Sequence, residues 1–151
     1  MTGLLALVLV AAGLGPVWYF SDAQVAARAH GEAIERWEAM EPTAYRFEFS
    51  YCSGMCAPCP RTITVTKGEV TGVEVRGRDC PHDKDGAPTI EDVLALADRM
   101  RSDGGTGGIE YNHYWGYPES ADFLCSPAAA DCGEGFTVTS FHALPRTRTA
   151  R

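Results

Sequence analysis

Hydrophobic and polar residues alternate in three segments of the first half of the chain. Residues 45–51 carry Tyr or Phe at every second position, so one face of this segment is aromatic and the other is polar. Residues 61–67 and 70–76 alternate in the same way, and Gly68-Glu69 lies between them. All three segments are therefore predicted to be β-strands, and the last two are predicted to form a hairpin.

A helical period of apolar residues precedes these strands and covers residues 21–40. Ser21, followed three residues later by Gln24, is the pattern of a capping box. Pro42 is expected to end the helix. The apolar positions predicted to face the core are Ala26, Ala29, Ala33, Trp37 and Met40.

The helical period returns after a polar loop at residues 77–88 and predicts a second helix. Thr89 and Asp92 make a second capping box, and Gly104-Gly105 is expected to end the helix. The predicted buried face consists of Ile90, Val93, Leu94, Ala97 and Met100.

Two further strands are predicted in the C-terminal third. Residues 109–115 have aromatic side chains on both faces and are broken or bent by Gly116-Tyr117-Pro118, and residues 136–141 make the last strand. The glycine-rich residues 104–108 follow a helix, so we interpret them as a flexible linker rather than a phosphate-binding loop. Strands that are neighbours in sequence usually pair. We therefore expect an α+β fold, with an antiparallel sheet of about five to six strands and two helices on one face.

An uncharged N-terminal segment precedes this domain. Residues 3–20 would make a hydrophobic helix of about 27 Å, close to the thickness of a bilayer core. We expect residues 1–20 to be a membrane anchor, with a cleaved signal peptide as the alternative. Both interpretations place residues 21–145 outside the cytoplasm. Residues 146–151, which include Arg146, Arg148 and Arg151, are expected to be a disordered basic tail.

The chain is acidic, with a net charge of −7 and a sequence pI near 5.0. A broad nucleic-acid surface needs clustered Lys and Arg, so nucleic acid is not an expected partner. The expected partners are the membrane, through the N-terminal segment, and an envelope protein.

Six cysteines in 151 residues, outside the cytoplasm, predict three disulfides. Cys125 and Cys132 are expected to pair and close a local loop. The other four cysteines permit three connectivities, which stay open. The predicted disulfide residues are Cys52, Cys56, Cys59, Cys80, Cys125 and Cys132.

Cys52, Cys56 and Cys59 form a Cys-rich corner for which three chemical interpretations compete with disulfides. The spacing of these three cysteines resembles the iron–sulfur motif of radical enzymes, but the chain is too short for the large α/β barrel that such chemistry needs. Cys56 and Cys59 also have thioredoxin-like spacing, but a strand rather than a helix follows them. The same two residues with Cys80 and His82 could make a zinc site. The main prediction includes no metal and no cofactor.

No motif of a nucleophile with its base is found, so catalytic residues are not assigned and the chain is not expected to be an enzyme. His30 is expected to face solvent, and His113 is expected to be half-buried in an aromatic strand. An aromatic group on that strand is a candidate surface for binding a partner, because Tyr and Trp bind with little loss of entropy. Its members are Tyr111, Tyr114, Trp115 and Tyr117.

A set of short motifs runs through residues 37–141. It comprises Trp37, Tyr45, Cys59-Pro60, Val65, Lys67-Gly68-Glu69-Val70, Thr89-Ile90-Glu91-Asp92, Tyr111 and Gly116-Tyr117-Pro118. The set resembles a family of small exported bacterial domains of unknown function, many of them lipoproteins. The resemblance implies a fold and an exported location, and it implies no activity. The chain departs from the pattern at residues 119–135, a Cys-containing insertion where the family continues with a strand.

The sequence thus predicts an extracytoplasmic, membrane-tethered or secreted domain that acts as a non-enzymatic binding or structural module of the bacterial cell envelope. The alternative is an exported thiol–disulfide or zinc-binding protein that uses Cys56 and Cys59. A weaker third hypothesis is an inhibitor of an extracellular enzyme.

Overall fold

The structure, a computed structural model, describes residues 21–40, 42–53, 59–75, 86–103, 106–124 and 133–145. The predicted hydrophobic helix at residues 1–20 lies outside them. Among the helices that the structure describes, none has the length and apolar character needed to span a membrane. The elements, in chain order, are α1 (Asp22–Met40), β1 (Ala44–Ser53), β2 (Arg61–Thr66), β3 (Glu69–Val75), α2 (Ile90–Ser102), β4 (Thr106–Tyr111), β5 (Pro118–Leu124) and β6 (Gly133–Ala143).

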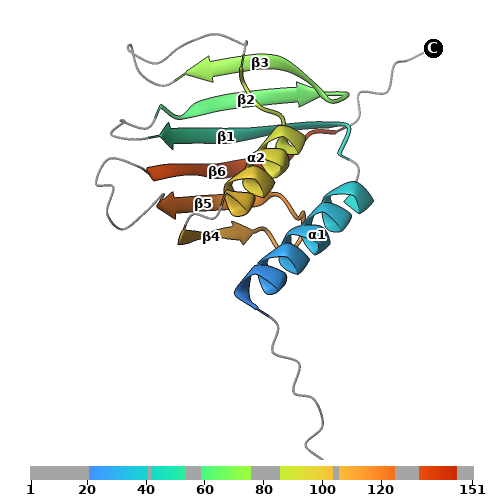
Figure 1. Cartoon of the computed structure of the whole chain (residues 1–151). Helices are drawn as coiled ribbons and strands as arrows, with labels where there is room; N and C mark the ends of the chain where they lie inside the picture. The colour runs from blue at the N-terminus through green and yellow to red at the C-terminus, as the bar shows by residue number, and fades with distance from the viewer. Residues whose placement is uncertain are drawn as a thin grey trace, which may run out of the picture.

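The six strands form one sheet in the order β3-β2-β1-β6-β5-β4, and every neighbouring pair is antiparallel. Both helices pack on the same face of the sheet (Figure 1). The α+β prediction, with two helices on one face, is therefore confirmed for the described residues. β6 inserts beside β1, so the N-terminal and C-terminal strands form the centre of the sheet.

Strand β1 is central because its aromatic face fills the core. Tyr45, Phe47 and Phe49 are all almost fully buried, as the alternation predicts. Tyr51 continues this face at the end of the strand and is partly exposed. Ile63 and Val65 extend the buried face onto β2.

Both capping boxes form. The backbone N–H of Ser21 donates to Gln24 Oε1, and the N–H of Gln24 donates to Ser21 Oγ. Thr89 and Asp92 exchange the corresponding bonds at the start of α2. Each pair satisfies N–H groups that have no partner within the helix, which fixes where the helix begins.

The turn between β2 and β3 lies one residue earlier than predicted. Lys67 and Gly68 have φ angles of 56° and 77°, so these two residues occupy the centre of the turn instead of Gly68 and Glu69. Two left-handed residues match the twist of a tight hairpin. The N–H of Lys67 also donates to the carbonyl of Thr43, which ties the turn to the chain entering β1.

The predicted strand at residues 109–115 is wrong in its second half. β4 ends at Tyr111 and the chain turns back, so β5 begins at Pro118. The side-chain oxygen of Asn112 accepts hydrogen bonds from the backbone N–H groups of Tyr114 and Trp115, which bends the chain locally. The turn closes when the N–H of Gly116 donates to the Asn112 carbonyl.

Two further expectations fail in this region. Gly107 and Gly108 belong to β4 and are not part of a linker. Residues 118–124, most of which were assigned to an insertion, form β5 between β4 and β6. Among residues 118–122, whose side chains the structure describes, Pro118 and Ala121 are buried, and this alternation is too weak to reveal the strand.

The buried face of α1 is shorter than predicted. Ala33 and Trp37 are buried, whereas Ala26, Ala29 and Met40 are exposed. Residues 21–29 are all exposed because this end of the helix extends past the edge of the sheet, as the blue part of α1 in Figure 1 shows. Helical period alone does not tell where the neighbouring layer ends.

An aromatic cluster joins α1 to the sheet around Phe141 of β6. The ring of Phe141 lies 4.7 Å from that of Tyr117, 5.1 Å from Trp115 and 5.8 Å from Trp37, measured between centroids. Gly116 lies beside this cluster with φ of +86°, and the backbone of α1 at Ala33 and Trp37 passes directly over it. Only glycine combines this φ with such a close approach.

We predict that Gly116→Ala lowers the free energy of unfolding by about 3 kcal/mol or more, because the methyl group is strained at positive φ and overlaps the Ala33 carbonyl. Urea denaturation measures the change. Gly31→Ala is the matched control: Gly31 is exposed on α1 with no atom near the added methyl, so this change should stabilise the protein by about 0.5–1 kcal/mol. Equal effects of the two changes would contradict the close packing of α1 on the β4–β5 turn.

Candidate functional site

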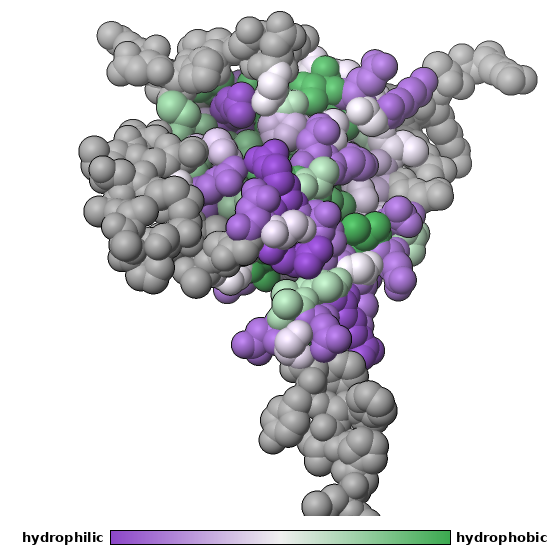
Figure 2. Space-filling model, viewed as in Figure 1, coloured by the Kyte–Doolittle hydropathy of each residue, from purple (hydrophilic) through white to green (hydrophobic). Residues whose placement is uncertain are grey.

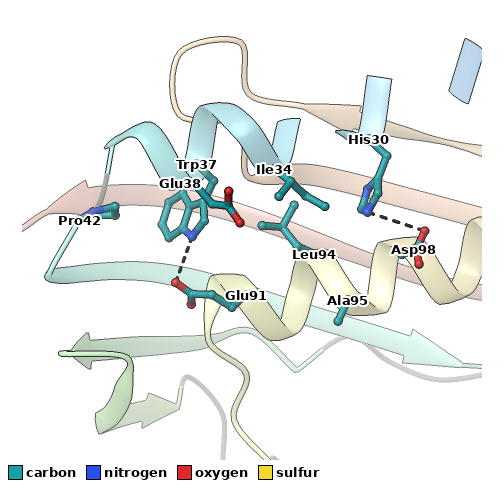
Figure 3. Close-up of a pocket in the computed structure, with 9 residues that line it drawn as sticks. All are labelled: His30, Ile34, Trp37, Glu38, Pro42, Glu91, Leu94, Ala95 and Asp98. Atoms are coloured by element: carbon teal, nitrogen blue, oxygen red, sulfur yellow. Dashed lines mark hydrogen bonds and ion pairs between the residues drawn. The ribbon is translucent and has the colours of Figure 1, made fainter. Parts of the chain in front are cut away.

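A groove of about 670 Å³ runs between α1 and α2 on the helical side of the protein. Figure 2 shows this face, where hydrophilic surface surrounds a small hydrophobic area between the helices, and Figure 3 shows the side chains. The groove extends from Pro42 at one end to His30 and Asp98 at the other. Its lining residues are His30, Ile34, Trp37, Glu38, Pro42, Glu91, Leu94, Ala95 and Asp98.

The groove combines an apolar floor with an acidic rim. Ile34, Trp37 and Leu94 supply apolar surface, whereas the charged residues of the lining are Glu38, Glu91 and Asp98. Among the described residues that line it, none is Lys or Arg. Three carboxylates beside low-dielectric walls create a negative potential that attracts cations.

The carboxylate of Glu91 joins three elements at one end of the groove. Trp37 Nε1–H of α1 donates to Glu91 Oε1 at 3.0 Å, and the hydroxyl of Tyr45 on β1 donates to Glu91 Oε2 at 2.8 Å. The Tyr45 oxygen in turn accepts the backbone N–H of Ile90 at 3.1 Å. Glu91 lies in the first turn of α2, where the helix dipole favours a negative charge.

The Tyr45 hydroxyl stays protonated and can serve as this donor. Burial disfavours the phenolate and raises the pKa of Tyr45, and the negative charge of Glu91 raises it further. The bond from Ile90 favours the phenolate, but it is outweighed. The carboxylate is thus held from two sides, and its orientation at the edge of the groove is fixed.

His30 forms the other end of the groove and is buried, so the expectation that it faces solvent is wrong. Its Nδ1 lies 2.7 Å from the hydroxyl of Tyr111, and its Nε2 lies 3.8 Å from Asp98 Oδ1. His30 precedes Ala33 and Ile34 by one helical turn and therefore lies on the same inward face of α1. Tyr111, which gives it a polar partner, is 81 residues away in the sequence.

The burial of His30 favours its neutral form. Burial lowers the pKa of His30, Asp98 opposes this shift, and Arg101 adds to it. Asp98 is itself bonded to Arg101 at 2.6 Å, which lowers the pKa of this carboxyl. Burial raises the pKa of Tyr111 to about 12, so its hydroxyl remains protonated and donates to an unprotonated Nδ1.

This His–Tyr pair is arranged for packing rather than for activating a nucleophile. At 3.8 Å, Asp98 is too far from Nε2 for a hydrogen bond that would orient the imidazole as a base. A phenol whose pKa is raised is also a weaker nucleophile at neutral pH than a free tyrosine. We therefore interpret the pair as a polar link that joins α1 to β4 beneath the groove.

The four aromatic residues predicted to bind a partner do not lie on one strand. Tyr111 contacts His30, Tyr117 is buried against Phe141, and Trp115 is half-buried. Tyr114 is 64% exposed at the tip of the β4–β5 turn. Binding of a partner by this group stays a prediction. His113 lies in the same turn and is exposed, so the expectation of a half-buried strand position is wrong.

Cys52, near the end of β1, and Cys59, before β2, are both disulfide-bonded in the structure. The remaining predicted positions, Cys56, Cys80, Cys125 and Cys132, lie outside the described residues, as does His82. The three-disulfide prediction and its zinc alternative therefore stay predictions. Within the described ranges, no group of three or more His, Cys, Asp or Glu side chains is placed to hold a metal ion.

A family model confirms the resemblance to a family of unknown function. The sequence model of a family of unknown function, DUF6174, matches residues 30–143, which is most of the chain. The chain belongs to this family. The match begins at His30 and ends at Ala143, so it includes the groove-lining part of α1, all of α2 and all six strands. No curated protein and no solved structure matches the chain.

The groove of this DUF6174 member was not predicted from the sequence. Glu91 was assigned only to the start of the second helix, and no role was predicted for Glu38 or Asp98. A signal was present on the second helix: Glu91 and Asp98 are seven residues apart, with Ala95 between them, which places them on one exposed face. The first helix could not be matched to this face without the tertiary fold.

We predict that Glu91→Gln lowers the free energy of unfolding by about 1–2 kcal/mol, because the amide –NH₂ cannot accept the bond that Trp37 or Tyr45 donates. Tyr45→Phe should cost about 1 kcal/mol by itself. Urea denaturation of the two single variants and the double variant gives the coupling, expected to be at least about 0.5 kcal/mol. Glu35→Gln, exposed on α1, is the control. Strictly additive costs would contradict the shared network.

We predict that protonation of His30 destabilises the fold in mild acid. Because its pKa is lowered in the folded state, the unfolded chain binds more protons below its ordinary pKa near 6.5. The stability that wild type gains from neutral His30 is present above that pH and is lost as pH falls through the lowered pKa. The difference in unfolding free energy between wild type and His30→Gln should therefore shrink from pH 7.5 to pH 5. A difference that stays constant between these two pH values would contradict the burial of His30.

Proposed function

We propose that this chain is a non-enzymatic binding domain of the bacterial cell envelope, and that the groove between α1 and α2 holds a basic segment of another envelope protein. The domain is extracytoplasmic, and residues 1–20 either anchor it to the membrane or direct its secretion. The observation that carries the proposal is the combination of three carboxylates with an apolar floor in one groove that no Lys or Arg of the described chain lines.

The chemistry of the groove selects a basic occupant. A Lys or Arg side chain has an apolar stem that can lie along Ile34 and Leu94 while its charged end reaches a carboxylate. An acidic peptide or a phosphate would be repelled. Glu38 has no hydrogen bond or ion pair within the described part of the chain, so its charge is available to a ligand.

The shape of the groove suits an extended peptide rather than a compact small molecule. The part of the groove that α1 lines, from His30 to Glu38, is about 12 Å long at 1.5 Å per residue. That length accommodates about four residues of extended chain. A peptide of this length could place basic side chains near Asp98 and Glu91 at the same time.

The position of α1 supports a tethered domain. Its exposed residues 21–29 extend past the sheet, and they connect the groove-bearing part of the helix to residues 1–20. These nine exposed residues would hold the groove about 13 Å from the end of the apolar segment. A groove held at that distance from a membrane is accessible to neighbouring envelope proteins.

A synthetic peptide, Lys-Leu-Lys-Pro-Leu-Lys, tests the proposal. We expect it to bind the full chain in zwitterionic micelles with a dissociation constant of order 10–100 µM at low salt, and to weaken several-fold at 0.5 M NaCl as the charges are screened. Fluorescence anisotropy of the labelled peptide measures binding, and empty micelles give the blank. The acidic counterpart Glu-Leu-Glu-Pro-Leu-Glu should not bind.

Ala95→Arg should weaken binding at least about tenfold, because Ala95 is exposed in the groove wall and the new guanidinium repels the probe. Ala23→Arg is the matched control, since Ala23 is an exposed helical alanine that does not line the groove. Both variants change the net charge equally. Equal loss in the two variants, or binding that neither changes, would place the interaction elsewhere on the acidic surface and contradict the proposal.

A further inference from the structure

We propose that the basic C-terminal segment of this chain, residues 146–151, docks in the groove between α1 and α2 and competes with the incoming basic partner. This inference rests on the proposed function, because it gives the same groove an internal ligand. It replaces the expectation of a solvated tail. The observations that carry it are where the described chain ends, the spacing of the arginines, and the charge of the groove.

The chain leaves the sheet beside one end of the groove. The N–H of Leu144 donates to the carbonyl of Ala44 at 2.9 Å, so the last described residues lie against the start of β1. Pro42, two residues before Ala44, lines the groove at its Glu91 end. Leu144 therefore lies within about 12 Å of Pro42, because paired strands are about 5 Å apart and two residues of extended chain span about 7 Å.

The arginines are spaced to follow the carboxylates. Glu91 and Asp98 are seven residues apart on α2, which is about 10 Å along the helix. Arg148 and Arg151 are three residues apart, which is also about 10 Å in an extended chain. Arg146 would meet the carboxylate of Glu38 near the entrance, and the two later arginines would reach Glu91 and Asp98 in turn.

The charges of the two parts are complementary. Three arginines in six residues approach three carboxylates, of which Asp98 is already paired with Arg101. Residues 146–151 contain no Asp or Glu, and no Lys or Arg is among the described residues that line the groove. A segment attached so close to its site acts at a millimolar effective concentration, so even weak docking occupies the groove for most of the time. A partner must then displace the tail, which reduces its apparent affinity by the fraction of groove that is free.

The direct test neutralises the tail and observes the groove without any added ligand. Arg146→Gln, Arg148→Gln and Arg151→Gln are combined in the full chain in zwitterionic micelles. We expect the ¹H–¹⁵N resonances of Glu38, Ala95 and Asp98 to shift relative to wild type at low salt, and the differences to fade at 0.5 M NaCl. The control combines Arg28→Gln, Arg46→Gln and Arg99→Gln, three exposed arginines outside the groove lining, and makes the same change in net charge.

The functional test compares affinity for the peptide Lys-Leu-Lys-Pro-Leu-Lys. Neutralising the tail should raise its affinity about threefold to tenfold, and the control triple variant should raise it by less than about twofold. An equal gain in the two triple variants would show an effect of net charge alone and overturn the proposal. Wild-type and tail-neutralised groove resonances that coincide at low salt would also overturn it.

Two further outcomes separate this inference from the function on which it rests. If the groove resonances respond to the tail but no peptide binds to either protein, the tail docks and the proposed function fails. If the peptide binds wild type but the tail variant changes neither its affinity nor the resonances, the function stands and the tail does not dock. Resonance differences that disappear when the protein is diluted a hundredfold would assign the docked tail to a second copy of the chain and contradict intramolecular docking.

Discussion

The carboxylate of Glu91 holds both helices and the sheet in their relative positions. Trp37 of α1 and Tyr45 of β1 donate to its two oxygens, and the Tyr45 hydroxyl also accepts the N–H of Ile90 at the start of α2. The distance between α1 and α2, and hence the width of the groove, depends on these bonds. Glu91 also contributes negative charge to the groove. The same side chain therefore orders the fold and sets part of the charge of the groove.

Most of the fold could be predicted from local patterns, because alternation and capping residues act over a few positions. The aromatic face of β1 and the start of α2 at Thr89 are examples. Features that depend on distant partners could not be predicted. His30 looks solvated on its own helix, but in the fold it is buried, with the Tyr111 hydroxyl as its polar partner. The side chain of Asn112 bends a segment that looks like one continuous strand in the sequence, so the hydrophobic pattern does not predict the turn.

The groove is rigid at both ends and open between them. Glu91 is fixed at one end by Trp37 and Tyr45, and at the other end Asp98 is fixed by Arg101. A site whose charges are already oriented loses little conformational entropy when a ligand binds. In this member of a family of unknown function, the proposed binding groove would therefore present charges that are already oriented. This arrangement also makes the groove sensitive to any basic segment nearby, including one from the same chain.

The indole N–H resonance of Trp37 reports most directly whether a basic ligand binds in the groove. The chain has three tryptophans, and of the two in the described residues, Trp37 and Trp115, it is Trp37 that lines the groove and donates its indole N–H to Glu91. During titration with Lys-Leu-Lys-Pro-Leu-Lys, a cation near Glu91 should move the Trp37 indole resonance in a saturable manner, whereas that of Trp115 should stay in place. A Trp37 resonance that does not move while the peptide binds would contradict the assignment of the groove as the binding site.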